Sequence, residues 1–210
     1  MLLSPRPIVA LPSEETFRCA AFPKKPLSLP DLQNSDAAVD LSIVIPAFNE
    51  VPRLPDMLAT TIKHLEKPEY RRRTCEIIIV DDGSTDKTTE KALQLAKLYN
   101  SWDIRVVTLE VNLGKGGAVR HGMLHSRGLR LLMADADGAS RFEDLEILWK
   151  ELDRISPAGE PALVIGSRAH LIKTDAVVKV LWLTCSFSEY IFTAMNSVLS
   201  CVTWPCTHFI

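Results

Sequence analysis

The sequence predicts an α/β fold in which a mostly parallel, Rossmann-like sheet carries helices on both faces. Short apolar runs rich in β-branched residues are typical of strands buried on both sides. Segments with a helical apolar period separate these runs, as crossover connections between parallel strands require. The polar and glycine-containing motifs directly follow the runs, so they fall in strand-to-helix loops. Right-handed crossovers bring those loops to one edge of the sheet, where open α/β sheets bind ligands.

Five apolar runs are the predicted strands. In chain order they are residues 41–48 (LSIVIPAF), 75–80 (CEIIIV), 104–109 (IRVVTL), 129–134 (LRLLMA) and 162–166 (ALVIG). Each run is short and bounded by polar or turn-forming residues. Their alternation with helical segments predicts the order βαβαβαβαβ.

Helices are expected in the four intervening segments. The stripe of the first is Leu54, Met57, Leu58, Thr61, Ile62 and Leu65, and that of the last is Leu145, Leu148, Trp149, Leu152 and Ile155. Asp86 is placed to cap a helix that runs to about Tyr99. Gly128 is placed to close a helix that starts near Lys115.

Composition changes mark three regions along the chain. Residues 1–40 contain Pro5, Pro7, Pro12, Pro23, Pro26 and Pro30, which break any helical period, so we expect an irregular leader there. Residues 41–174 are the expected catalytic α/β domain. Residues 175–210 form an apolar tail, whose last 21 residues carry no charge unless His208 is protonated.

The composition excludes several classes of protein. The 210 residues are 47% hydrophobic and 24% charged, which suits a globular domain, and a net charge of −2 gives no sign of a nucleic-acid partner. Five scattered cysteines without a CxxC motif indicate neither a disulfide framework nor a zinc site. The first 40 residues lack the apolar core of a signal peptide. A reducing compartment is therefore expected.

Two aspartates follow the fourth predicted strand. Asp135 and Asp137 stand in the sequence LLMADADG, and alternation along an extended strand would point both side chains the same way. Hard carboxylate oxygens suit Mg²⁺ or Mn²⁺, which takes its remaining ligands from substrate phosphates and water. Aspartates also end strands as turn or cap residues, so the pair alone does not decide between a metal-diphosphate site and a turn.

The first two loops are acidic. The sequence PAFNE follows the first strand and VDDGSTD follows the second, so Glu50 and Asp82 lie where a dinucleotide fold would place glycines. Carboxylates suit a base imide or ribose hydroxyls better than a phosphate. A proline-bent strand end and a capped turn are the structural alternatives.

The remaining two loops carry cations. Residues 112–122 (NLGKGGAVRHG) match neither a Walker A motif nor GxGxxG, because Leu109 and Val119 occupy positions where glycine is required. A glycine-rich helix start with Lys115 can still hold a phosphate, although a tight connection explains it equally well. Arg168 follows the fifth strand, where a guanidinium can bind phosphate oxygens.

Together these motifs resemble glycosyltransferase family 2, whose nucleotide-diphosphosugar-binding domain has the GT-A fold. The sequences VIPAFNE, VDDGSTD, NLGKGGAVRHG, LLMADADGAS and GSRAHL occur in the order and spacing of the family. Within this family, the sequences DADGA and GSRAHL are most similar to those of the dolichyl-phosphate β-glucosyltransferases. The resemblance spans residues 41–171.

The resemblance implies roles for individual residues. Those expected to contact the nucleotide sugar are Pro46, Phe48, Glu50, Val80, Asp82, Lys115, Asp135 and Ala136. Asp135 and Asp137 would hold Mg²⁺ or Mn²⁺, and Arg168 would bind the diphosphate and act in catalysis with both aspartates. Ala139 offers no side-chain oxygen and is left out of the metal set.

The implied reaction is transfer of glucose from UDP-glucose to dolichyl phosphate, with inversion, which supplies dolichyl phosphate glucose for protein N-glycosylation. The implied location is the cytosolic face of the endoplasmic reticulum membrane. Because the leader has no apolar helix to anchor it, part of the protein could also be soluble. The sequence does not define an oligomeric state.

Two alternatives remain beside this interpretation. The tail has no counterpart of the family's acceptor segment, so the chain could be a truncated isoform that binds nucleotide sugar and metal without transfer. A related polyprenyl-phosphate enzyme with another sugar is the second. The uncharged end of the tail has the length of a bilayer span, but Asn196 and Pro205 interrupt it, which leaves interfacial packing, a buried helix or an alternatively spliced end open.

Overall fold

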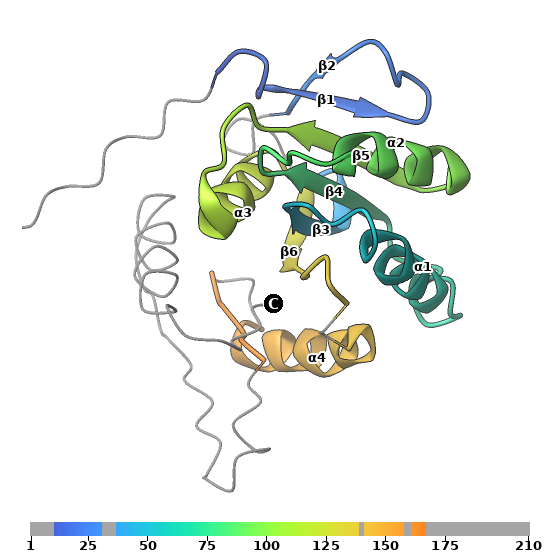
Figure 1. Cartoon of the computed structure of the whole chain (residues 1–210). Coiled ribbons are helices and arrows are strands. Elements are labelled where there is room, and N and C mark those ends of the chain that lie inside the picture. The colour runs from blue at the N-terminus through green and yellow to red at the C-terminus, as the bar shows by residue number, and fades with distance from the viewer. Residues whose placement is uncertain (1–10, 31–36, 139–140, 158–160, 167–210) are drawn as a thin grey trace, which may run out of the picture.

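The computed structural model describes residues 11–30, 37–138, 141–157 and 161–166, which form a six-stranded sheet with helices on both faces (Figure 1). The strands are β1 (Thr16–Cys19), β2 (Leu27–Ser28), β3 (Val39–Ala47), β4 (Cys75–Asp81), β5 (Asp103–Thr108) and β6 (Gly128–Met133). The helices are α1 (Leu54–Leu65), α2 (Thr88–Leu98), α3 (Gly114–Leu124) and α4 (Leu145–Ile155), with a 3₁₀ turn, η1 (Phe142–Asp144), before α4. The predicted α/β class is therefore confirmed.

The order of the sheet is β2-β1-β5-β4-β3-β6, and the four neighbouring strands β5, β4, β3 and β6 are parallel. Ile43 of β3 lies opposite Ile77 of β4 on one side and Leu132 of β6 on the other. Because these strands run in one direction, their carboxyl ends and the loops that follow share one edge.

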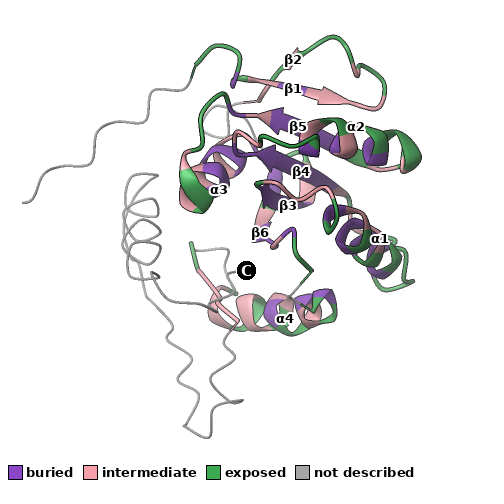
Figure 2. Ribbon diagram, viewed as in Figure 1, coloured by how far each residue is buried: buried purple, intermediate pink, exposed green. Residues whose placement is uncertain are grey.

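Each face of the sheet has its own core (Figure 2). Helices α1 and α2 cover one face, where Leu58 and Ala92 pack with Ile43 and Ile77. Helix α3 covers the other face. It lies so close to the strands that a Cβ at Gly122 would be 2.5 Å from Cγ1 of Val44.

The helical stripes fall where the sequence predicts them. All six stripe residues of α1 are buried, as are Leu145 and Leu148 at the start of α4. The N-cap of α2 is Lys87 and not Asp86 as predicted, but the Asp86 carboxylate accepts the backbone N–H of Thr88, the first residue of α2, at 2.9 Å and so stabilises the helix start. Within the described ranges, no helix combines the length and apolar composition that a membrane span needs.

The expectation of an irregular leader is wrong for two segments. β1 pairs antiparallel with β5 and β2 pairs antiparallel with β1, so residues from the proline-containing leader extend the sheet. Phe17 is buried in the core beneath α3, and the Arg105 guanidinium stacks on its ring at 4.6 Å. Very short strands separated by prolines give little alternation to recognise, and long-range pairing decides their structure.

Two further expectations need correction. Residues 161–166 form no strand, and Ile165 instead packs against Val119 and Met133, which explains the apolar run without any pairing. Gly128 does not close α3, which ends at Leu124. It starts β6, where a Cβ would lie 2.5 Å from the backbone nitrogen of Ser42. The tail 175–210 lies outside the described residues.

A buried carboxylate joins three strands and the α3–β6 loop at the edge opposite the loops named above. Glu76 on β4 is fully buried and accepts hydrogen bonds from the Ser42 hydroxyl at 2.5 Å and from Nε of Arg127 at 2.9 Å. Arg105 lies 3.6 Å from Glu76, and Asp103, which pairs with both arginines, balances the second positive charge. Removing one partner of such a group leaves other charges uncompensated.

We therefore expect Glu76→Ala to lower the free energy of unfolding by about 3–5 kcal/mol, the usual cost of breaking a buried ion pair. Urea denaturation followed by circular dichroism measures this. The exposed pair of Glu151 and Arg154 provides the control, because Glu151→Ala should leave the midpoint almost unchanged. Equal midpoints for both variants would show that the Glu76 network contributes nothing.

Candidate functional site

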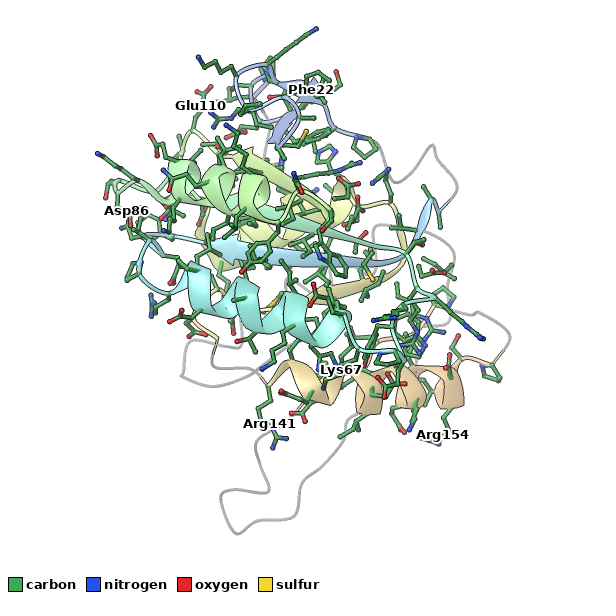
Figure 3. The ribbon with its side chains drawn as sticks, turned by 90° about the vertical axis from the view of Figure 1, so that its right-hand side faces the viewer. Phe22, Lys67, Asp86, Glu110, Arg141 and Arg154 are labelled. Atoms are coloured by element: carbon green, nitrogen blue, oxygen red, sulfur yellow. The ribbon has the colours of Figure 1, made fainter. Side chains whose placement is uncertain are left out.

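Loops from four elements meet at the carboxyl edge of the parallel strands. Residues 48–53 follow β3, residues 82–87 follow β4, residues 109–113 follow β5, and residues 134–138 follow β6. Figure 3 labels Asp86 at this edge and Lys67 beyond the far end of α1. The acidic and glycine-rich motifs are thus gathered at one edge, as the sequence predicts.

Asn49 joins the first two loops. Its φ of 57° is in the left-handed region, where asparagine is better tolerated than most residues. Its side-chain oxygen accepts backbone N–H groups from Thr85 at 3.0 Å and Asp86 at 3.2 Å, and its own N–H donates to the hydroxyl of Ser84 at 2.9 Å. The predicted site set omitted this residue, although its position in a short loop after a strand was an available signal.

The two adjacent aspartates at the end of β4 have different surroundings. Asp81 accepts the Ser84 N–H at 3.1 Å and the Thr89 hydroxyl, so it shapes its own loop. Asp82 is 3% exposed, and its Oδ1 accepts the Leu113 N–H at 2.7 Å. Asp82 therefore holds the start of α3 next to the β4 loop.

Burial raises the pKa of the Asp82 carboxyl above its ordinary value. Backbone N–H groups of Leu113 and Gly114 oppose this shift, and the nearby charge of Asp81 adds to it. The buried carboxylate is thus held by backbone donors of the next loop.

Asp135 and Asp137 lie beyond the end of β6, in the turn at residues 134–138. The argument from strand alternation does not apply to them, because β6 ends at Met133. Oδ1 of Asp135 lies 2.5 Å from Nζ of Lys115, which comes from the first turn of α3. Asp137 is exposed. The structure therefore brings the third and fourth loops into contact through an ion pair.

Glu50 interacts electrostatically with these two aspartates. Burial raises the pKa of its carboxyl, Asp137 and Asp135 add to the increase, and Arg53 opposes it. Nε of Arg53 lies 2.6 Å from the Glu50 carboxylate. The three acids therefore form one negatively charged region.

The remaining residues that were predicted to contact the nucleotide sugar differ in how far they are exposed. Phe48 is 45% exposed at the edge of the site. Pro46, Val80 and Ala136 are all buried, and Val80 is fully covered beneath α3 in the core with Val44 and Ala118. The side chains of these three residues are buried. A ligand at this edge would therefore contact their backbone atoms or the residues beside them. Arg168 lies outside the described residues.

A pocket of about 260 Å³ opens beside the two aspartates. Its lining is Pro52, Arg53, Asp56, Met57, Thr60, Thr61, Ala134, Asp135, Asp137, Gly138 and Phe142. Carboxylates, hydroxyls and one guanidinium surround an apolar floor. Such a lining can form hydrogen bonds to a polyhydroxylated ligand.

The donor chemistry of the turn fits a hard divalent cation. In the described part of the chain, no group of three or more acidic, histidine or cysteine side chains converges to enclose a metal. Two carboxylates in one exposed turn suit Mg²⁺ or Mn²⁺, which is usually held by one or two carboxylates together with substrate phosphates and water.

We expect Asp82→Asn to flatten the dependence of stability on pH. The carboxyl binds its proton more readily in the native chain than in the unfolded chain, because its native pKa is raised. The stability that this proton contributes is complete below the unfolded pKa and is lost as pH rises through the native pKa. Urea midpoints from pH 4 to pH 7 should fall less for Asp82→Asn than for the natural chain.

Asp82→Ala is the matched control, because it removes the acceptor of the Leu113 N–H as well as the charge. Relative to Asp82→Asn, it should cost about 1–3 kcal/mol at every pH, the penalty for an unsatisfied buried donor. A parallel pH dependence for the natural chain and Asp82→Asn would contradict the burial argument.

Comparison with known proteins gives a consistent family. The family model described as glycosyl transferase family 2 matches residues 42–194. The chain is 45% identical to the dolichyl-phosphate beta-glucosyltransferase of Homo sapiens over 163 residues, 76% of this chain and 50% of the human protein. It is also 45% identical to the Saccharomyces cerevisiae protein of that name over 163 residues, 72% of this chain and 48% of the yeast protein. The chain thus spans about half the length of these relatives.

A solved structure supports the fold. The mannosyltransferase PcManGT from Pyrobaculum calidifontis, in complex with GDP-Man and Mn²⁺, superposes with a TM-score of 0.50 at 22% identity, over 69% of this chain and 39% of that one. At this identity the likeness concerns the arrangement of strands and helices alone.

Proposed function

The chain belongs to glycosyltransferase family 2, and we propose that it transfers glucose from UDP-glucose to dolichyl phosphate with inversion at the anomeric carbon. The observation that carries this proposal is the meeting of Glu50, Asp82, Lys115, Asp135 and Asp137 at one sheet edge, within the region that the family model matches. The names of the two relatives supply the donor sugar and the acceptor.

The first two loops are suited to the nucleoside. Phe48 presents exposed aromatic surface on which a base can stack, and Asn49 fixes the loop on either side of it. Glu50 supplies a carboxylate at the edge, and the buried Asp82 holds the adjoining loop in place. Carboxylates accept hydrogen bonds from a base imide or from ribose hydroxyls.

The third and fourth loops are suited to the diphosphate. Asp135 and Asp137 would hold Mg²⁺ or Mn²⁺. When bound, the cation would neutralise the developing negative charge on the leaving diphosphate. Lys115 supplies a cation of the chain itself within 2.5 Å of Asp135.

The reaction needs alignment more than it needs a strong base. A phosphate oxygen of the acceptor attacks the anomeric carbon, the bond from that carbon to the UDP oxygen breaks, and the electron pair leaves with UDP. The acceptor oxygen is already anionic at neutral pH, so no side chain has to remove a proton. The residues of the edge then act by orienting the donor and by stabilising charge.

We propose that the product, dolichyl phosphate glucose, is made at the cytosolic face of the endoplasmic reticulum membrane for protein N-glycosylation. The acceptor is a lipid, so the loop edge must face the membrane surface. The pocket beside Asp135 and Asp137 opens at this same edge.

Asp137→Ala tests the proposal. We expect it to lower transfer of labelled glucose from UDP-glucose to dolichyl phosphate by about 100-fold or more, because the leaving group loses charge stabilisation. The assay uses the purified full chain in detergent with Mn²⁺. Asp137 is exposed, so the urea midpoint should remain near that of the natural chain.

Glu69→Ala is the control, because it removes one exposed carboxylate from the α1–β4 loop, which leads into the opposite end of β4. It should retain full transfer. Metal-dependent transfer by Asp137→Ala at the natural rate would refute the assigned role. If the natural chain binds UDP-glucose but transfers nothing, it is a donor-binding protein and the transferase proposal fails.

A further inference from the structure

The ion pair between Lys115 and Asp135 occupies one of the two carboxylates assigned to the cation. Nζ of Lys115 is 2.5 Å from Oδ1 of Asp135, while 46% of the lysine side chain and 14% of the aspartate side chain remain exposed. The pair therefore lies at the surface of the site, where a charged ligand can reach it.

The lysine is positioned by the neighbouring loops. Asp82 accepts the N–H of Leu113 at 2.7 Å, and the side chain of Asn112 accepts the N–H of Gly114 at 2.9 Å. Gly114 has a φ of 78°, which few other residues adopt without strain. This turn places Lys115 directly after it, at the start of α3 and opposite the β6 loop.

Close packing inside the first turn of α3 fixes the same arrangement. A Cβ at Gly117 would lie 2.5 Å from Cβ of Leu113, so glycine lets Leu113 fold back against the helix. Leu113 in turn packs with the core beneath α3. A chain of contacts thus runs from Asp82 through Leu113 to Lys115 and Asp135, joining the second, third and fourth loops.

We propose that Lys115 is a resident counter-ion that holds Asp135 until a nucleotide diphosphate and a divalent cation bind together. This inference rests on the proposed function and adds a positioning residue to it. In the ligand-free chain, the ammonium group neutralises one carboxylate and repels a free cation. When the diphosphate binds, its negative charge gives the ammonium an alternative partner, and Asp135 is released to the cation.

Binding of metal and nucleotide must then be coupled. Free Mn²⁺ has to displace Lys115 from Asp135 at a cost, whereas Mn²⁺ arriving with UDP does not, because the lysine gains a phosphate partner. By linkage, each ligand strengthens binding of the other by the same factor. The same site without the lysine would bind the metal alone more tightly and would couple the two ligands less.

Lys115→Met tests this by binding measurements on the full chain without acceptor. Mn²⁺ alone, titrated by electron paramagnetic resonance, should bind about three- to tenfold more tightly than to the natural chain, as expected for removing one partly exposed positive charge near the ion. UDP in saturating Mn²⁺, titrated by calorimetry, should bind more weakly. The factor by which each ligand promotes the other should shrink toward one.

Two controls separate charge from structure. Lys115→Arg keeps the positive charge and should retain the weak binding of Mn²⁺ alone. Lys97→Met removes the same charge from the last turn of α2 and should change neither titration. Unchanged urea midpoints in all three variants would confirm that the fold is intact.

Binding of Mn²⁺ alone to Lys115→Met that is equal to or weaker than in the natural chain would overturn the proposal. If neither the natural chain nor Lys115→Met binds Mn²⁺, the proposal is also overturned, together with the assignment of the metal site. If Lys115→Met binds Mn²⁺ more tightly but the natural chain transfers no glucose, the counter-ion role is supported and the transferase activity is refuted.

Discussion

The hydrogen bond from the Leu113 N–H to the buried carboxylate of Asp82 is the contact on which the site depends. At 2.7 Å it joins the residue that follows β4 to the start of α3. The order of strands and helices alone would not fix the distance between these two loops. A carboxylate hidden from water is costly unless donors surround it, and here the donors belong to the backbone of the next loop. The position of Lys115, and through it the contact with Asp135, follows from this arrangement.

Electrostatic balance explains why so many acids can share one edge. Burial raises the pKa of the Glu50 carboxyl, and the charges of Asp137 and Asp135 add to the increase. Arg53 and Lys115 offset part of this negative charge. The remaining negative potential suits a divalent cation with its phosphate ligands better than a phosphate alone. The stabilising network around Glu76 lies at the opposite edge, so the charges that hold the domain together are separate from those assigned to function.

The sequence was sufficient for the central part of the fold and for the meeting of the acidic and glycine-rich loops at one edge of the sheet. Continuous β-branched runs identified β3, β4, β5 and β6, and the parallel order then brought the acidic loops to one edge. Strands β1 and β2 were not predictable, because their pairing with β5 and with each other depends on contacts far apart in the chain. Ile165 shows the converse error, since an apolar residue packed against α3 and β6 resembles part of a strand.

Within the site, residue types were predictable but contacts were not. The spacing of Asp135 and Asp137 indicated a cation site, yet the ion pair with Lys115 depends on the left-handed turn at Gly114 and on Asp82. Val80 and Pro46 are predicted to contact the nucleotide, and their side chains are buried because β4 and β3 are central strands, so that contact stays a prediction. A motif gives the order of residues along the chain, whereas burial is decided by which helix covers each face.

A structure of the full chain with UDP-glucose and Mn²⁺ would test the account most directly. The account predicts that the nucleotide lies across the carboxyl ends of β3 and β4, that the diphosphate lies beside Asp135 and Asp137, and that Lys115 has moved from Asp135 to a phosphate oxygen. A nucleotide bound elsewhere, or a Lys115 ion pair that stays intact beside the bound diphosphate, would contradict it.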